Sequence, residues 1–128
     1  MGALRLSPKP DETFPALLRS IAYQQLNGRA AATIHGRVLA RFSKERPLTP
    51  KNLLATPAAR LRAAGLSANK LRAMRDLAGK ALSGVVPTRA AAEKLSDGEL
   101  IARLTEVRGI GRWTVQMFLI FYLGRPDV

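Results

Sequence analysis

The chain has 128 residues, among which 21 lysines and arginines face nine aspartates and glutamates, so its formal net charge at pH 7 is +12. This excess points to a polyanionic partner, although a solvated basic surface is the simpler explanation of charge alone. A hydrophobic fraction of 47% excludes a disordered basic tail. The chain has no cysteine, which excludes disulfides, thiolate metal sites and a cysteine nucleophile. Its length suits a single hydrophobic core, so we expect one domain.

The hydropathy pattern gives no indication of a membrane protein. The longest apolar run covers residues 117–123, whereas a membrane-spanning helix needs about 20 such residues. No basic and then apolar leader opens the sequence. We therefore expect an intracellular protein that does not contact membranes.

Apolar residues recur at helical spacing from the N-terminal part onwards, and no alternating strand pattern of useful length occurs. A first helix is expected to begin near Thr13, and Asn27 can cap a second. Thr49-Pro50 and Thr56-Pro57 each place a capping residue before a proline that suits the first helical position, and Gly65 follows the second pair. These signals predict two short helices.

A longer helix is predicted from Ser67 to Gly84, and a short element near 88–94 follows it. Ser96 with Glu99 forms a capping box that begins the next helix.

The last helix is expected to run from about Arg112 to Leu123 and to end at Gly124 and Pro126. Its unbroken apolar stretch predicts burial on nearly all sides.

Between the last two predicted helices lies the run 107–114, which contains Gly109 and Gly111. Glycines at alternate positions let the backbone take positive φ and approach another surface closely. Their amides, together with those that open the following helix, can form a small anion site. A dinucleotide-binding loop is excluded because it requires a preceding strand and a third glycine. The run therefore predicts a helix, a hairpin and a helix.

Four segments, in order along the chain, resemble the helix-hairpin-helix (HhH-GPD) DNA glycosylases, and within them most closely the bacterial 3-methyladenine DNA glycosylase II branch. These segments are residues 23–31, 64–67 with Lys70, 107–114 and 118–128. The resemblance implies an all-α helix-hairpin-helix domain over residues 13–128, with the hairpin at 107–112, after an N-terminal segment of residues 1–12.

The same resemblance implies an enzyme of base-excision repair that flips alkylated purines from damaged double-stranded DNA and hydrolyses the N-glycosidic bond. Leu26 stands at the family's wedge position, with Gln25 beside it, although helical periodicity alone favours Leu26 as a core residue. Trp113 and Met117 match the base pocket, where an indole face attracts a cationic base. Core packing is the alternative for both.

The resemblance also bears on the reaction. Bifunctional members carry a lysine nucleophile two residues after the second hairpin glycine, where this chain has Trp113, so we expect monofunctional hydrolysis without AP lyase activity. The family's catalytic aspartate follows the Gly-Arg-Pro-Asp-Val pattern and would lie beyond Val128. We therefore expect no catalytic residue in this chain, which looks incomplete at its C-terminus. Asp127 matches an earlier position, and Glu99 and Glu106 are typical of helix surfaces.

By resemblance the hairpin grips the DNA backbone. Its phosphate contacts would be the amides of Gly109 and Gly111 and the cations Arg108, Arg112 and Lys70. Judged singly, each of these cations is more readily explained as an ordinary surface residue than as a phosphate contact.

A monovalent cation, Na⁺ or K⁺, is further implied at the backbone carbonyls of Thr105, Val107 and Gly109, while no cofactor is required. His35, the only histidine, is expected to be a structural or surface residue. We expect a monomer in the cytoplasm that associates with the nucleoid through DNA.

Two other function classes stay open. A non-catalytic helix-hairpin-helix module that binds DNA would explain the hairpin and the charge, but not Leu26 and Trp113 together. A basic helical scaffold for RNA or an acidic protein rests on composition alone.

Overall fold

The computed structural model describes residues 12–24 and 26–125, and all regular elements in these ranges are α-helices, as the sequence predicts. In chain order the helices are α1 (Thr13–Tyr23), α2 (Gly28–Leu39), α3 (Pro50–Ala55), α4 (Ala58–Arg62), α5 (Ala68–Ser83), α6 (Arg89–Ala92), α7 (Asp97–Leu104) and α8 (Arg112–Phe121). Within the described ranges, none of them combines the length and the apolar character of a bilayer-spanning segment.

Local capping sets most helix boundaries. The side chains of Asn27 and Ser67 each accept an N–H from the first turn of the helix that follows, α2 and α5 respectively. Ser96 and Glu99 form the predicted reciprocal capping box of α7. Gly84 ends α5 in the left-handed region with φ of +90°. These short-range signals were sufficient to predict the corresponding helix ends.

The start of α4 differs from the prediction. Pro57 precedes the first helical residue instead of occupying it, and Thr56 ends α3 by donating its N–H to the carbonyl of Leu53 at 3.2 Å. The Thr56 hydroxyl donates to the carbonyl of Asn52 at 2.9 Å and accepts from Arg46 at 2.6 Å. Because this hydroxyl is already engaged and buried, it does not cap α4.

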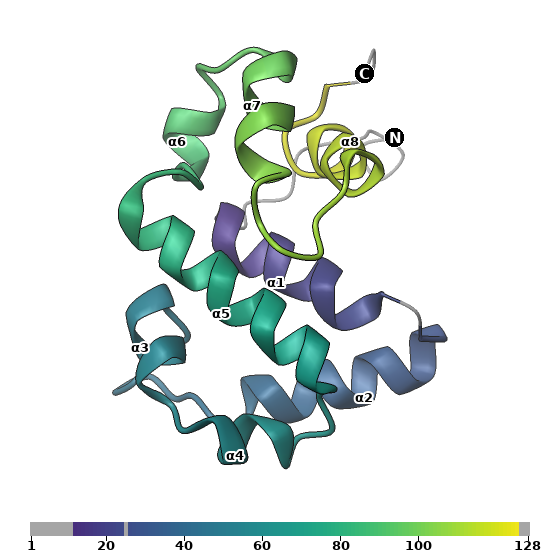
Figure 1. Ribbon diagram of the computed structural model, residues 1–128, viewed down its shortest axis with the longest axis vertical. Coiled ribbons are helices and arrows are strands. Elements are labelled where there is room, and N and C mark those ends of the chain that lie inside the picture. Colours follow the sequence, from purple (N-terminus) through teal and green to yellow (C-terminus); the bar gives the residue numbers. More distant parts are fainter. Residues whose placement is uncertain (1–11, 25, 126–128) are drawn as a thin grey trace, which may run out of the picture.

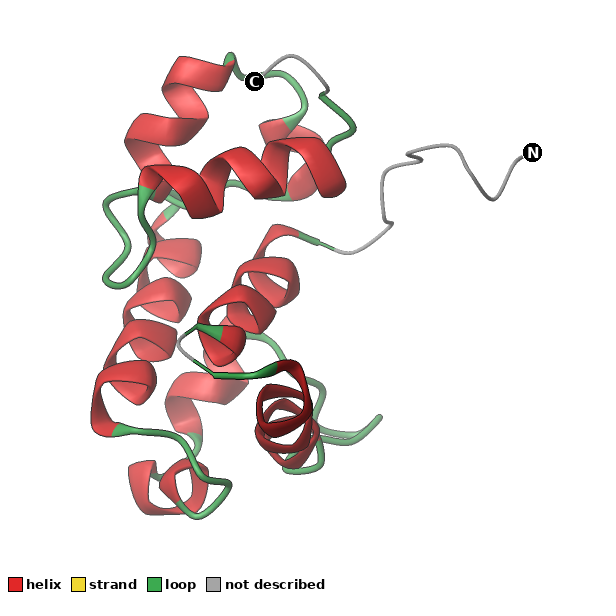
Figure 2. Ribbon diagram, turned by 90° about the vertical axis from the view of Figure 1, so that its right-hand side faces the viewer, coloured by secondary structure: helices red, strands yellow, loops and turns green. Residues whose placement is uncertain are grey.

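The helices are arranged around a central pair, α1 and α5 (Figure 1). The helices α2, α3 and α4 lie at one end of this pair, and α6, α7 and α8 lie at the other, as the view turned by 90° also shows (Figure 2). The fully buried Leu17 of α1, Leu77 of α5, Leu53 of α3 and Leu119 of α8 belong to one hydrophobic core. Both ends of the molecule therefore pack on the same two helices.

The apolar stretch of α8 is less buried than predicted. Phe118 and Leu119 are buried, but Phe121 is 49% exposed, and the helix ends there rather than at Leu123. The prediction of burial on nearly all sides is therefore wrong, because Met117 and Ile120 are only half-buried and Phe121 is exposed.

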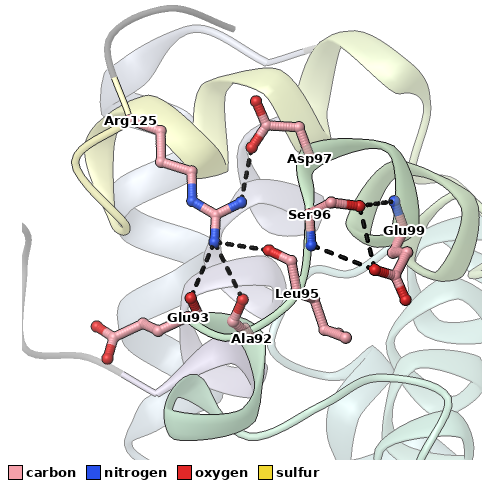
Figure 3. Close-up of polar contacts among 7 residues, drawn as sticks. All are labelled: Ala92, Glu93, Leu95, Ser96, Asp97, Glu99 and Arg125. Atoms are coloured by element: carbon pink, nitrogen blue, oxygen red, sulfur yellow. Dashed lines mark hydrogen bonds and ion pairs between the residues drawn. The ribbon is translucent and has the colours of Figure 1, made fainter.

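Arg125 joins the segment after α8 to the connection between α6 and α7 (Figure 3). Its Nη1 donates to Asp97 Oδ1 at 2.6 Å, and its Nη2 donates to the carbonyls of Ala92, Glu93 and Leu95 at 3.2, 3.3 and 2.9 Å. A planar guanidinium presents several donors in one fork, which suits this set of acceptors. The contact therefore holds α8 against the N-terminal end of α7.

We expect Arg125→Lys to lower the free energy of unfolding by about 1–3 kcal/mol, because an ammonium cannot reach the carboxylate and the three carbonyls together. Urea unfolding measures this loss. Arg37→Lys is the matched control, since Arg37 is an exposed residue of α2. Equal unfolding midpoints for the two variants would contradict the role of Arg125.

Candidate functional site

The turn that links α7 to α8 descends onto the central helices α1 and α5 (Figure 1). Val107 and Ile110 anchor it in the core at 2% and 4% exposure, and the Ile110 N–H donates to the Val107 carbonyl at 3.1 Å. Arg108, Gly109 and Gly111 are exposed. The predicted hairpin is therefore present, with apolar residues holding it and its glycines facing outward.

The two hairpin glycines serve different purposes. Gly109 has φ of +83°, and a Cβ on it would lie 3.1 Å from the Cβ of Ala73 in α5. Gly111 is the N-cap of α8 with φ of −97°, and a Cβ there would meet nothing within 4 Å. The prediction of positive φ is confirmed for Gly109 and wrong for Gly111, because the chain has already reversed when it reaches Gly111.

Gly111 also leaves the start of α8 without a side-chain cap. The N–H groups of the first turn, which carries Arg112 and Trp113, therefore have no capping side chain beside them. The positive end of the helix dipole lies at the same place, so the geometry suits an anion.

Two polar contacts that sequence reasoning missed fix the hairpin. Asp76 Oδ2 of α5 accepts the Arg108 N–H at 2.8 Å, and Gln24 Nε2 donates to the Gly109 carbonyl at 2.7 Å. The only local signal at Asp76 is its spacing to Lys80, which forms an i,i+4 ion pair at 2.7 Å. The Gln24 contact spans 85 positions and has no local signal.

The charge of Asp76 is stabilised where it holds the hairpin. Burial alone would raise the pKa of Asp76, but hydrogen bonds from Lys80 and from the Arg108 N–H, with the charges of both residues, bring this pKa below its ordinary value. The carboxylate is therefore ionised at neutral pH and acts only as an acceptor.

Lys70 lies beside the hairpin but has a structural partner as well. Its Nζ donates to the carbonyl of Ala22 at 2.9 Å, near the end of α1, and burial lowers the pKa of Lys70. Lys70 shares a cleft of about 470 Å³ with Arg108 and Gly109. Its predicted contact with phosphate stays a prediction, and two of its three ammonium hydrogens are left for such a contact.

Trp113 is not a core residue, because it is 70% exposed in the first turn of α8. It lines a second cleft, of about 630 Å³, between α1 and α8, and Met117 lies in the same cleft, so the two predicted pocket residues are brought together. The complete lining is Arg19, Ser20, Tyr23, Gln24, Trp113, Thr114, Met117 and Phe121. Sequence reasoning missed the α1 wall of this cleft.

Tyr23 is already covered on one ring face. The guanidinium of Arg19 lies 4.1 Å from the Tyr23 ring centroid, and His35 meets the same ring edge-on with centroids 6.0 Å apart. Burial, and secondarily the charge of Arg19, lower the pKa of His35, which is therefore neutral at pH 7. His35 supports Tyr23, in agreement with its expected structural role, and Trp113 presents the open aromatic face.

Leu26, the predicted wedge, is 39% exposed in the turn between α1 and α2, so it is not the core residue that periodicity alone favours. Its predicted neighbour Gln25 lies outside the described residues, as does Asp127. Of the other two carboxylates, Glu99 belongs to the capping box and Glu106 is exposed.

Two of the predicted cation ligands also accept hydrogen bonds within the protein. The carbonyl of Gly109 faces the Gln24 N–H, and the carbonyl of Val107 accepts the Ile110 N–H. Each carbonyl oxygen has a second lone pair besides the one that accepts the hydrogen bond. The ion at Thr105, Val107 and Gly109 stays a prediction.

The chain is similar to known DNA glycosylases in both sequence and structure. DNA-3-methyladenine glycosylase 1 of Schizosaccharomyces pombe is 41% identical over 122 residues, which are 95% of this chain and 54% of that protein. A structure of the 3-methyladenine DNA glycosylase Mag1 from the same yeast, in complex with abasic DNA, superposes with a TM-score of 0.89 at 40% identity, over 97% of this chain and 60% of that one. The chain is homologous to 3-methyladenine DNA glycosylases.

A DNA-3-methyladenine glycosidase from Bacillus halodurans gives a TM-score of 0.86 at 35% identity, over 98% of this chain and 56% of that one. No protein-family model matches the chain. The chain spans about half the length of the curated relatives it matches, with 54% of one and 61% of another.

Gly109→Ala is expected to lower the free energy of unfolding by about 1–2 kcal/mol, because an L-residue at this φ is strained and its Cβ would crowd Ala73. Gly111→Ala should change it by less than about 0.5 kcal/mol, since a slightly poorer N-cap is offset by a less flexible unfolded chain. Urea unfolding of both variants tests the contrast. Equal effects would show that the left-handed turn is not where the hairpin is constrained.

Asp76→Asn should destabilise the protein near neutral pH and progressively less in acid. Because the folded-state pKa of Asp76 is lowered, its contribution is fully present above the ordinary carboxyl pKa and is lost as pH falls through the folded-state pKa. The difference in unfolding free energy between wild type and variant should therefore shrink below about pH 4. Glu106→Gln is the control, because it also removes one negative charge but does so at an exposed site. A difference that does not vary with pH would refute the assignment.

Proposed function

We propose that the described residues are the DNA-gripping and base-flipping part of a DNA glycosylase that removes alkylated purines from duplex DNA. We place it in the helix-hairpin-helix (HhH-GPD) superfamily, on the 3-methyladenine DNA glycosylase II branch. The observation that carries the proposal is Trp113, which is exposed in a cleft directly after the hairpin. The homology to proteins named for this activity supports it.

The hairpin would hold the DNA backbone. The N–H groups of Gly109, Gly111 and the first turn of α8 lie at the positive end of the helix dipole. Arg108 and Arg112 are exposed beside them. Such contacts neutralise phosphate without reading sequence, as a repair protein that searches for rare lesions requires.

Base flipping would use the turn between α1 and α2. Extruding a nucleotide costs a few kcal/mol and leaves a gap in the stack. Leu26 is exposed and apolar, so it can fill this gap, and we propose that Gln25 assists it.

The extruded base would enter the cleft of Trp113 and Met117. Alkylation at N3 or N7 makes a purine cationic and weakens its glycosidic bond, and a cation is attracted to the open indole face. Arg19 covers the neighbouring Tyr23, so the attraction falls on Trp113.

Hydrolysis is the reaction that fits these residues. Trp113 stands where bifunctional relatives would need an amine, so water rather than an imine-forming lysine is the nucleophile, and an abasic site is the product. By resemblance, a carboxylate that follows the Gly-Arg-Pro-Asp-Val segment would stabilise the charge on the sugar. We propose that the protein acts as a monomer on damaged duplex DNA at the nucleoid, with water as the only co-reactant.

Competition binding tests the function. A labelled duplex with a central abasic analogue is bound to the chain and displaced by unlabelled abasic duplex, undamaged duplex or RNA. The abasic duplex should compete best, and affinity should fall steeply with salt. Equal competition by all three would support a generic basic module and contradict the proposal.

Trp113→Ala should reduce the preference for a duplex with 7-methylguanine over its undamaged counterpart by about tenfold, because the indole face is lost. Affinity for undamaged duplex should not change, since the hairpin is untouched. Trp113→Phe, which keeps an aromatic face, is the control and should lose less. Parallel losses on both duplexes would mean that the cleft does not receive the base.

A further inference from the structure

Gln24 lies where α1 ends and the turn that carries Leu26 begins, which we call the wedge turn. It is the C-cap of α1 with φ of −66° and ψ of 136°, and its backbone N–H donates to the Ile21 carbonyl at 3.3 Å. The chain therefore leaves the helix at Gln24 and reaches Leu26 two residues later. Any restraint on Gln24 acts directly on the position of this turn.

The side chain of Gln24 supplies such a restraint. Its Nε2 donates to the Gly109 carbonyl at 2.7 Å, which links the end of α1 to the apex of the hairpin. Gln24 also lines both clefts, the one with Lys70 and Arg108 and the one with Trp113. Gln24 is thus shared by the cationic cleft and the aromatic cleft.

Residues next to both partners of this bond are also held by side chains of α5. Lys70 Nζ fixes the Ala22 carbonyl at the end of α1, and Asp76 fixes the Arg108 N–H in the hairpin. Removing the Gln24 donor would leave these two anchors in place. The hairpin would stay seated, whereas the direct link between it and the wedge turn would be lost.

We propose that Gln24 is a positioning residue that couples the wedge turn to the hairpin. Through this bond Leu26 enters the duplex in register with the phosphates that the hairpin holds. The inference rests on the proposed function and adds a residue that acts through Leu26.

Gln24→Met tests the coupling, because methionine has a similar length and no N–H donor. The preference of the chain for an abasic-analogue duplex over undamaged duplex should fall about three- to tenfold, which corresponds to one hydrogen bond. Affinity for undamaged duplex should be unchanged. Gln116→Met makes the same chemical change on α8 outside both clefts and should keep the wild-type preference.

A double-variant cycle with Leu26→Ala separates positioning from a general structural effect. If Gln24 acts through Leu26, adding Gln24→Met to Leu26→Ala should cause no further loss of preference. Additive losses would overturn the inference.

Gln24→Lys restores an N–H donor and should recover most of the preference ratio. This variant also tests the coupling if the methionine variant does not fold. No recovery in the lysine variant would likewise overturn the inference.

The wild-type chain distinguishes the two levels of failure. If it shows no preference for the abasic duplex, the proposed function fails. If it shows the preference and Gln24→Met keeps it in full, only the role of Gln24 fails.

Discussion

The close seating of the hairpin on α5 is the constraint on which the site depends. Gly109 and Ala73 are the two smallest residue types, and a Cβ on the glycine would already lie 3.1 Å from the Cβ of Ala73. Beside this close contact, the Asp76 carboxylate accepts the Arg108 N–H at 2.8 Å. Steric contact thus sets the distance between the hairpin and α5, and the ionised Asp76 carboxylate stabilises the hairpin at that distance.

This seating also orients the cleft. α8 begins directly after the hairpin, so the direction of its first turn, and with it Trp113, follows from how the hairpin lies on α5. On the other side, Lys70 holds the end of α1 and so sets the opposite wall of the cleft. The proposed backbone grip and the proposed base pocket are therefore two consequences of one arrangement around α5.

Local chemistry explains which features the sequence could predict. The capping box of Ser96 and Glu99 acts within one turn, so its pattern is visible in the sequence and in the structure alike. Thr56 shows the limit of such local patterns. Its hydroxyl accepts a hydrogen bond from Arg46, which lies in a loop outside the capping pattern. Trp113 and Leu26 could be placed by resemblance, whereas Asp76 and Gln24 could not. Asp76 has an obvious helical partner in Lys80, and Gln24 has a partner 85 residues away.

The exposure of Trp113 has an optical consequence. It is the only tryptophan in the chain and is 70% exposed in the cleft. The indole fluorescence of this protein therefore originates entirely from the place where we expect the base to stack. A purine that stacks on the ring would quench that emission, while a duplex held only by the hairpin would leave it nearly unchanged. If the base stacks there as we propose, the wild-type chain carries its own reporter of extrusion, which can be timed separately from binding without any added label.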